Sequence, residues 1–180
     1  QRNTIAIQSP ILDATVDGKY QLTQIGDAIT NSISRYYDFN PKAKKTKTQP
    51  QLLAFKAVVK NNPVLFQLLP ELKGFEPIAL NGRYNSQNDT IILNAAIPKI
   101  IYGANNLTNA IVKIDTKDEA LVYNIFIDDL KNAQVDLPYA NISGTVKDDV
   151  LAYTLLIKDV KDKDRYLLAG QLQSENGDTQ

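Results

Sequence analysis

The stretch "GRYNSQNDTIILNAAIP", residues 82–98, predicts two β-strands joined by a polar turn. In both arms every second residue is apolar, which is typical of a strand with one covered face and one solvated face. Pairing Tyr84 with Ile91 places Gly82 opposite Leu93 and keeps the apolar residues together. Because a slip of one residue would turn every side chain to the other face, the pattern predicts this register.

The same alternation continues from Ile78 almost to the C-terminus, interrupted by the polar clusters "NSQND", "DTKDE", "VKDD" and "VKDKD". These clusters predict a meander of hairpins. The further pairs that we predict are Leu80–Ala95, Ile78–Ile97, Ile114–Leu121, Val112–Tyr123, Val146–Leu151, Gly144–Tyr153 and Ile142–Leu155. A glycine opposite a large side chain recurs among them, which supports the register because large side chains cover bare strand positions.

We therefore expect a mainly β fold: an antiparallel meander curved into an open trough, with one amphipathic helix and one short helix. Asn81, Asn94, Lys113 and Asn124 give the opposite face a polar character. The residues predicted to line the apolar face are Ile78, Leu80, Tyr84, Ile91, Leu93, Ile97, Val112, Ile114, Leu121, Tyr123, Ile125, Ile142, Leu151, Tyr153, Leu155, Ile157, Tyr166 and Leu168.

Three arrangements would cover such a face, and the pattern alone leaves them open. A closed, lipocalin-like barrel would pair its first and last strands around one small ligand. A structural strut or assembly module would fill the concave side with its own side chains. An open trough would keep unpaired edges and an apolar path running across the strands.

The chain divides into four parts. Residues 1–40 hold strand-like segments, "NTIAIQ" and "ATVDGKYQL", and an amphipathic helix at 26–37 with a stripe that includes Ile25, Ile29 and Ile33. This helix is long enough to fill part of the trough. Residues 41–50 are a Lys/Pro-rich linker or loop, 51–173 the meander with a short helix near 62–70, and 174–180 a disordered tail. The lysines at 42, 44, 45 and 47 are interpreted as a solvated loop.

The short helix is predicted from its end signals. Asn62 is a suitable N-cap, Pro63 suits the first helical position, and Pro70 ends or bends the helix, with Gly74 allowing a left-handed exit. Because Val64, Leu65, Phe66, Leu68 and Leu69 make it apolar on most sides, we expect it to be covered, as a plug against the sheet.

Composition excludes several functions. The 180 residues contain 20 Lys plus Arg and 20 Asp plus Glu, so the formal net charge is zero and no nucleic-acid partner is indicated. The chain has no His, Cys, Met or Trp, and therefore lacks the commonest general base, a thiol nucleophile and soft metal ligands. It begins at Gln1 without a Met anywhere, and we expect it to be an excised piece of a longer protein.

The aspartates are the remaining candidates for chemistry, and they are interpreted as turn residues. Asp128, Asp129, Asp148 and Asp149, and the aspartates of "DVKDKD" at 159, 162 and 164, fall in or near predicted turns, where Asp bonds to the local backbone. "DVKDKD" lacks the Gly and the closing Glu of a calcium loop. We expect no enzyme activity and no cofactor.

Three segments carry a resemblance to a known family: "NNPVLFQLLPELKGFEPIALNGRYNSQNDTIILNAAIPKIIYG", "NNLTNAIVKIDTKDEALVYNIFID" and "DKDRYLLAGQL". Across residues 51–173 the chain resembles the C-terminal half of TamB-type proteins of the AsmA-like superfamily. The shared feature is a rhythm of hairpins after a helix like "LLPEL".

The resemblance implies a β-taco, a folded-over sheet with a hydrophobic concave side, in an envelope protein of a diderm bacterium that is anchored in the inner membrane and crosses the periplasm. It also implies that the groove conducts phospholipid acyl chains between inner and outer membranes. A further implied role is outer-membrane protein assembly with a BamA-like barrel partner.

Overall fold

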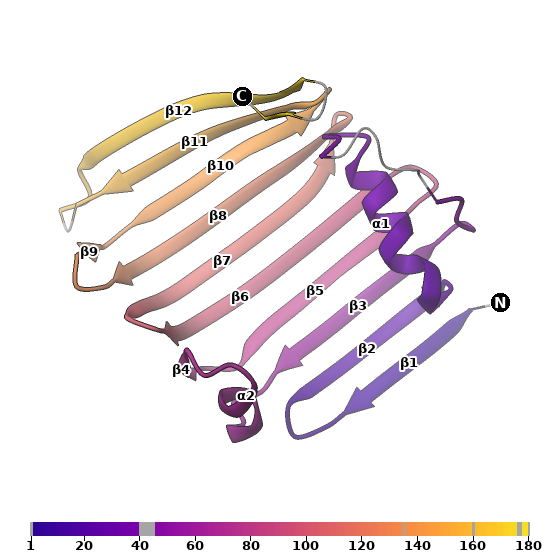
Figure 1. Ribbon diagram of the computed structural model, residues 1–180, viewed down its shortest axis with the longest axis horizontal. Helices are drawn as coiled ribbons and strands as arrows, with labels where there is room; N and C mark the ends of the chain where they lie inside the picture. Colours follow the sequence, from indigo (N-terminus) through magenta and orange to yellow (C-terminus); the bar gives the residue numbers. More distant parts are fainter. Residues whose placement is uncertain (1, 40–45, 135, 160, 176–177, 180) are drawn as a thin grey trace.

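The computed structural model describes residues 2–39, 46–134, 136–159, 161–175 and 178–179. Its elements are β1 (Asn3–Gln8), β2 (Leu12–Lys19), η1 (Leu22–Gln24), α1 (Ile25–Ile33), β3 (Leu52–Val59), α2 (Pro63–Leu68), β4 (Leu72–Phe75), β5 (Ile78–Asn85), β6 (Thr90–Tyr102), β7 (Asn105–Lys117), β8 (Ala120–Lys131), β9 (Asp136–Leu137), β10 (Ala140–Lys147), β11 (Val150–Lys158), β12 (Asp164–Glu175) and β13 (Asp178–Thr179). Figure 1 shows the strands in one broad sheet with α1 across its face.

The strands follow the order β1-β2-β3-β5-β6-β7-β8-β10-β11-β12-β13, and every pairing is antiparallel. The short strand β4 pairs with β6 on the side where β5 pairs with it, and the short strand β9 pairs with β8 on the side where β10 does. Within the described residues no pair joins β1 to β12, so the sheet stays open. The predicted fold class is confirmed, and closure into a lipocalin-like barrel is excluded.

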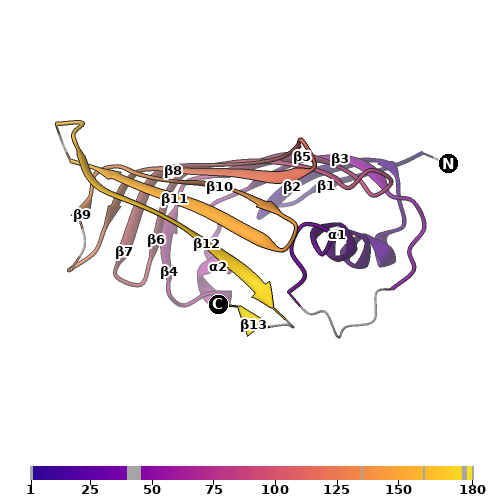
Figure 2. The ribbon, with the colours of Figure 1, turned by 90° about the horizontal axis from the view of Figure 1, so that it is seen from above.

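The sheet is curved, and both helices lie on its concave side. Figure 2 shows the strands arching above both α1 and α2. We call the concave face of the sheet the trough. Because α1 and α2 together contain few residues, most of the concave face has no helix over it.

Two of the three predicted hairpin registers are confirmed. In the first hairpin the pairs Tyr84–Ile91, Gly82–Leu93 and Leu80–Ala95 form as predicted. The predicted pair Ile78–Ile97 is not among the pairs of this hairpin. In the third hairpin all three predicted pairs are present. Its turn is formed by Asp148 and Asp149, which both have positive φ (50° and 60°), as a two-residue hairpin turn requires.

The register predicted for the second hairpin is wrong by two residues. Ile114 pairs with Tyr123 and Leu121 pairs with Thr116, so the predicted Ile114–Leu121 and Val112–Tyr123 pairs do not form. The turn is formed by Asp118 and Glu119, with φ of 52° and 61°, one residue further along than the predicted register requires. Thr116 thereby stays in the strand, where its hydroxyl accepts a hydrogen bond from the Ile91 amide at 2.9 Å. A shift of two preserves the face of every side chain.

Helix α1 ends four residues before the predicted boundary. Its last regular residue is Ile33, and the chain continues in a turn in which the Tyr36 and Tyr37 amides both donate to the Ile33 carbonyl. Both tyrosines are buried, so the predicted stripe still faces the sheet after the helix has ended.

Helix α2 begins as predicted but is not covered. The Asn62 side chain accepts from the Val64 amide at 3.0 Å, and Pro63 is the first helical residue. The helix ends at Leu68, and Gly74 lies in β4 without a positive φ, so it provides no left-handed exit. None of the helix residues is buried, and the exposed apolar side chains are Val64, Leu68 and the adjoining Leu69. The predicted plug is therefore wrong: α2 packs chiefly through the ring contact of Phe66 with Phe75.

The linker and the tail are described in part. Of the linker lysines, Lys42, Lys44 and Lys45 lie outside the described residues, and Lys47 is exposed. Within 174–180, where we predicted disorder, Ser174 and Glu175 pair with Thr179 and Asp178, and residues 176, 177 and 180 lie outside the described part.

Aromatic rings lie over glycines at three places on the concave face. A Cβ added at Gly82 would lie 2.6 Å from the Phe55 ring, and one at Gly144 or Gly170 would lie 2.6 Å from the hydroxyl of Tyr123 or Tyr153. In each case the ring belongs to the strand that precedes the glycine's strand in the sheet order. Tyr153 therefore pairs with Gly144, as predicted, but its ring lies over Gly170 on the other neighbouring strand. The rings lie along the sheet because no side chain rises beneath them.

We expect Gly144→Ala to destabilise the protein by about 2 kcal/mol or more, because the added methyl group meets a filled space. It would lie 1.9 Å from the Ala152 carbonyl oxygen as well as against Tyr123. The control is Gly26→Ala in α1, where nothing lies within 4 Å and the better helix propensity stabilises by up to about 1 kcal/mol. Urea unfolding of both variants measures the difference; equal midpoints would contradict the close packing.

Candidate functional site

The concave face consists of four rows of side chains that run across the strands. The helix row lies nearest α1 and comprises Gly18, Leu53, Tyr84, Ile91, Thr116, Leu121, Val146, Leu151 and Leu172. The aromatic row follows, with Ile5, Val16, Phe55, Gly82, Leu93, Ile114, Tyr123, Gly144, Tyr153 and Gly170.

The other two rows form the floor of the trough toward α2. The middle row comprises Ile7, Ala14, Ala57, Leu80, Ala95, Val112, Ile125, Ile142, Leu155 and Leu168. The far row comprises Leu12, Val59, Ile78, Ile97, Ala110, Ile127, Ala140, Ile157 and Tyr166. None of the four rows contains a charged residue.

The structure brings all the predicted face residues onto this surface. Tyr84, Ile91, Leu121 and Leu151 are in the helix row, and Leu93, Ile114, Tyr123 and Tyr153 are in the aromatic row. Leu80, Val112, Ile125, Ile142, Leu155 and Leu168 are in the middle row, and Ile78, Ile97, Ile157 and Tyr166 are in the far row. Their role in binding lipid stays a prediction.

Sequence reasoning missed the part of this face that comes from β1, β2 and β3. Val16 and Phe55 pair with each other, and Leu53 pairs with Tyr84, so the first strands continue the rows. The signal in "LLAFKAVV" is weak, because only Lys56 is polar and both faces of the strand are largely apolar. What the sequence did not show is that β2 and β3, separated by the helix and the linker, lie side by side.

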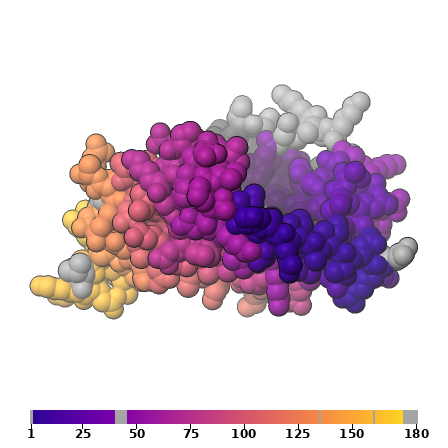
Figure 3. All heavy atoms as spheres, turned by 90° about the horizontal axis from the view of Figure 1, so that it is seen from below, coloured from indigo at the N-terminus to yellow at the C-terminus, as the bar shows by residue number. Residues whose placement is uncertain are grey.

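The trough is apolar and open to solvent. The large residues of the middle row from Leu80 to Leu155 are all partly exposed, and at the sheet edge Tyr166 and Leu168 are 57% and 54% exposed. Figure 3 shows a recess between the α2 segment and the segment around α1. An apolar surface of this extent that is not covered by the protein's own elements is the mark of a binding surface.

Two tyrosine hydroxyls of the concave face bond to other groups of the protein. The Tyr123 hydroxyl donates to the Ala152 carbonyl at 3.1 Å, and the Tyr84 hydroxyl lies 2.9 Å from the Ser32 hydroxyl. Burial raises the pKa of both Tyr84 and Tyr123 above the ordinary value. Tyr166, by contrast, is largely exposed.

Residues 22–38, which we call the strap, cover the helix row. Ala28 packs with Leu53 and Tyr84, and Tyr36 and Tyr37 pack with Val146. The strap thus extends over strands from β1 to β11 along one side of the trough, as α1 does in part in Figure 1.

Two hairpin aspartates hold the strap. Asp89, which is 8% exposed, accepts from the Ser32 hydroxyl at 2.7 Å and forms an ion pair with Arg35. Its carbonyl accepts from the Tyr36 hydroxyl at 2.9 Å. Because the Ser32 proton goes to Asp89, the Tyr84 hydroxyl is the donor to Ser32.

The second aspartate anchor lies in the β10–β11 turn. The Asp149 carboxylate accepts from the Asp38 amide at 2.7 Å, and the Asp149 amide donates to the Tyr36 carbonyl at 3.0 Å. Asp89 and Asp149 both have positive φ, so each projects from a tight turn at the same side of the trough.

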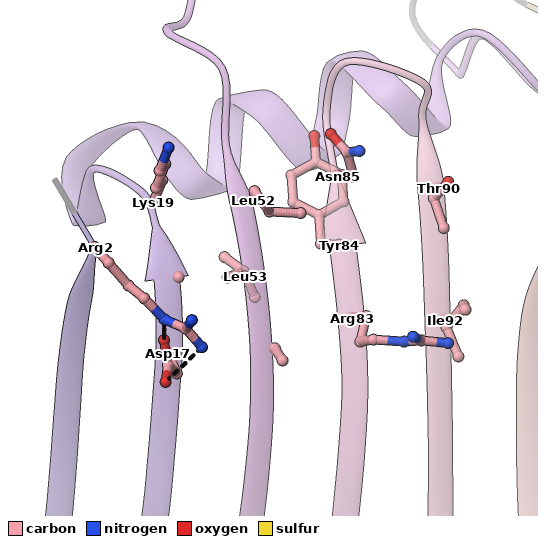
Figure 4. A pocket seen from close by; sticks show the side chains of 12 residues that line it. Arg2, Asp17, Lys19, Leu52, Leu53, Arg83, Tyr84, Asn85, Thr90 and Ile92 are labelled. Carbon is pink, nitrogen blue, oxygen red and sulfur yellow. Dashed lines mark hydrogen bonds and ion pairs between the residues drawn. The ribbon is translucent and has the colours of Figure 1, made fainter.

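The opposite face is mixed, with polar side chains and the exposed apolar residues Leu52, Val58, Ile111 and Leu167. The Asn81 and Asn94 amides hydrogen-bond at 3.3 Å, and those of Asn124 and Asn141 do so at 3.2 Å. Two hollows also lie on this face, over Ala54 between Asp17 and Arg83. Figure 4 shows Arg83 extended beside Ile92 and the Arg2 guanidinium bound to Asp17. That hydrogen bond holds the pKa of the Asp17 carboxyl below its ordinary value.

The other aspartates that we singled out serve local structure. Asp159 accepts from the Lys161 and Lys163 amides and Asp162 has positive φ, as in a turn. The prediction is wrong for Asp128 and Asp129, which lie inside β8, where Asp128 accepts from the Asn109 side-chain amide of the adjacent strand. The described residues contain no group of three or more acidic side chains that could hold a metal ion. The absence of enzyme activity and of a cofactor stays a prediction.

Comparison of the chain with protein-family models, with curated proteins and with solved structures gave no match. Among the described residues, neither helix is long and apolar enough to cross a membrane.

We expect the buried tyrosines to make stability fall in alkali. Below about pH 10 the phenols are neutral in both states, and above it the unfolded chain ionises first because the folded pKa of Tyr84 and Tyr123 is raised. Stability is therefore lost as the pH rises through the raised folded values. Urea midpoints at pH 9 and pH 11.5 should differ less in the Tyr84→Phe/Tyr123→Phe variant than in the unchanged protein. Equal losses would show that these hydroxyls are not responsible.

Proposed function

We propose that this chain is a segment of a lipid-conducting protein whose trough carries acyl chains across the strands of the sheet. The observation that supports this most directly is the continuity of the middle row, in which each residue from Ile7 to Leu168 pairs with the next and none is polar. The row runs from one edge strand to the other, perpendicular to the strands, as a path for a chain requires.

The hydrophobic effect sets what such a path contributes. Burying a methylene group is worth about 0.8 kcal/mol, so a 16-carbon chain left in water costs on the order of 12 kcal/mol. Unassisted passage through water is therefore too slow to be useful. An apolar floor removes part of this cost at every position along it, because one side of the acyl chain contacts protein throughout.

Movement along the floor also needs the absence of deep traps and of barriers. Aliphatic side chains such as Val112, Ile125 and Ile142 offer similar contact at successive strands, so no position binds much more tightly than the next. Beside them, the aromatic row is flattened where Phe55, Tyr123 and Tyr153 lie over glycines. A charge on the path would be a barrier, and the rows contain none.

The exposed apolar residues at the borders fit the same function. Leu168 and Leu172 continue the rows to the edge strand β12, and Val64 and Leu68 of α2 are exposed on the other side of the trough. The edges have free backbone groups, which allow the sheet to continue into neighbouring segments by strand pairing.

The resemblance to TamB-type proteins supports phospholipid as the cargo and the periplasm of a diderm bacterium as the location. The alternative of a structural or assembly module that works with an outer-membrane barrel predicts a concave face filled by the protein's own side chains. The clusters that contain strap residues include members of the helix and aromatic rows but none of the middle and far rows, so lipid conduction accounts for more of the surface.

Photocrosslinking in the intact protein in cells tests the path. A photoreactive residue at Leu155 or Ile125, in the middle row, is expected to label phospholipid because both side chains face the trough. The matched controls are Thr154 and Asn124, which precede them in sequence and face the opposite side. Equal labelling at both kinds of position, or none at either, would refute the proposal.

A charge in the middle row should stop transfer. We expect Val112→Arg to lower the rate of phospholipid transfer between donor and acceptor vesicles by about tenfold or more, because a guanidinium on the path must be desolvated as a chain passes. Ile111→Arg is the control, since Ile111 lies next in the chain on the opposite face. Circular dichroism must first show that both variants fold, and similar transfer rates would contradict the path.

A further inference from the structure

The strap packs on the sheet through two buried tyrosines, Tyr36 and Tyr37, whereas α1 itself buries only small side chains. The only buried residues of α1 are Ala28 and Ser32, both small. The helix is short, and neither end has a side-chain cap that bonds to its backbone. Its isoleucines at 25 and 29 are only partly buried. A helix of this length is not stable on its own, so its position depends on what anchors it.

Beside this packing, polar anchors hold the strap at two separate points. Around Asp89 the bonds come from Ser32, Arg35 and Tyr36, and around Asp149 they come from the backbone of residues 36–38. Both aspartates sit in hairpin turns at the rim, not on the floor. Breaking these bonds exposes polar groups that water can satisfy, which makes release of the strap less costly than exposure of an apolar core of the same area.

One buried group destabilises the attached position. The Tyr37 hydroxyl is buried without a hydrogen-bond partner, in a residue that is 2% exposed. An unpaired buried hydroxyl loses its bonds to water and gains nothing in return. The ring is covered on one side by Phe39, which is itself exposed. Release of the strap would return this hydroxyl to water.

The surface beneath the strap matches the open floor. Leu121, Val146 and Leu151 continue the apolar rows under Tyr36 and Tyr37. A lipid chain lying there would take the place of the two tyrosine rings, so strap and lipid compete for one surface. The middle row, by contrast, lies clear of the strap's core contacts.

We propose that the strap is a releasable gate, held shut by Asp89 and Asp149, that controls how much of the trough is open to acyl chains. The proposal rests on the proposed function, since it concerns regulation of the same surface. With the strap attached, chains occupy the middle and far rows. With the strap released, acyl chains can also occupy the helix row, which the attached strap covers, and the trough becomes wider by that row.

The first test measures release without lipid. In Asp89→Gly/Asp149→Gly both carboxylates are lost, while glycine accepts the positive φ of both turns. Hydrogen exchange of the amides at 28–37 should accelerate by about tenfold or more, with β6 to β8 unchanged. In the matched Asp89→Asn/Asp149→Asn variant the side-chain oxygens can still accept from Ser32 and the Asp38 amide, so exchange should rise less. Unchanged exchange in the glycine variant, or loss of protection throughout the sheet, would overturn the gate.

The second test locks the strap. The chain has no cysteine, so Ser32→Cys/Asp89→Cys contains a single pair, which replaces two side chains whose oxygens lie 2.7 Å apart. The pair is joined by oxidation or by a short bis-methanethiosulfonate, and reduction releases it. Both forms are exposed to a fatty acid that carries a diazirine in its chain, and the labelled residues are mapped by mass spectrometry.

The outcomes separate the two proposals. Labelling around Ile125 in both forms, with labelling around Leu121 and Leu151 only after reduction, is the result expected for a gate. Equal labelling of the helix row in the joined and reduced forms overturns the gate and leaves the proposed function standing. Absence of labelling anywhere on the concave face in either form overturns the proposed function and the gate with it.

Discussion

The constraint on which the structure depends is that every strand places its apolar residues on the same face of one wide antiparallel sheet. Backbone hydrogen bonds between neighbouring strands hold the rows in line, so that Val112 lies between Ala95 and Ile125, and Ile125 lies beside Ile142. The resulting apolar surface extends over all the strands from β1 to β12. Two short helices cover only part of this surface, and the sheet is curved but not closed into a barrel.

The glycines show how such a face can be flat as well as apolar. Gly82, Gly144 and Gly170 leave space that a ring from the adjacent strand fills, and a methyl group at any of them would collide with backbone or ring atoms. The rings cover area without projecting far from the sheet. A surface that has large contact area and low relief suits a flexible chain better than it suits a rigid ligand, which needs a shaped cavity.

The strap is the exception to the general openness of the concave side. Its buried polar cluster of Ser32, Tyr84 and Asp89 lies at the border of the apolar face, where the ion pair of Asp89 with Arg35 reaches solvent. Polar anchors specify one position for the strap, whereas apolar contact alone would permit sliding along the row. The strap is a separate element in this respect, because the backbone pairing of the sheet does not involve it.

The sequence by itself determined the strands, their faces and most of the hairpin registers, because alternation with period two is a local property that each strand carries in its own residues. It also determined the cap of α2 at Asn62, which acts over two residues. The register of the β7–β8 hairpin was wrong by two residues because backbone strain decides which residues form the turn, and the alternation of apolar residues carries no information about that strain. Only the tertiary structure decided what covers the apolar face. The joining of β2 to β3, the bare α2, and the bonds of Asp89 and Asp149 to the strap all link residues far apart in the chain, such as Ser32 with Asp89. Asp149 has the sequence signal of an ordinary turn residue, and Asp89 that of a polar turn cluster, because a side chain's partner across space leaves no mark on its neighbours in sequence.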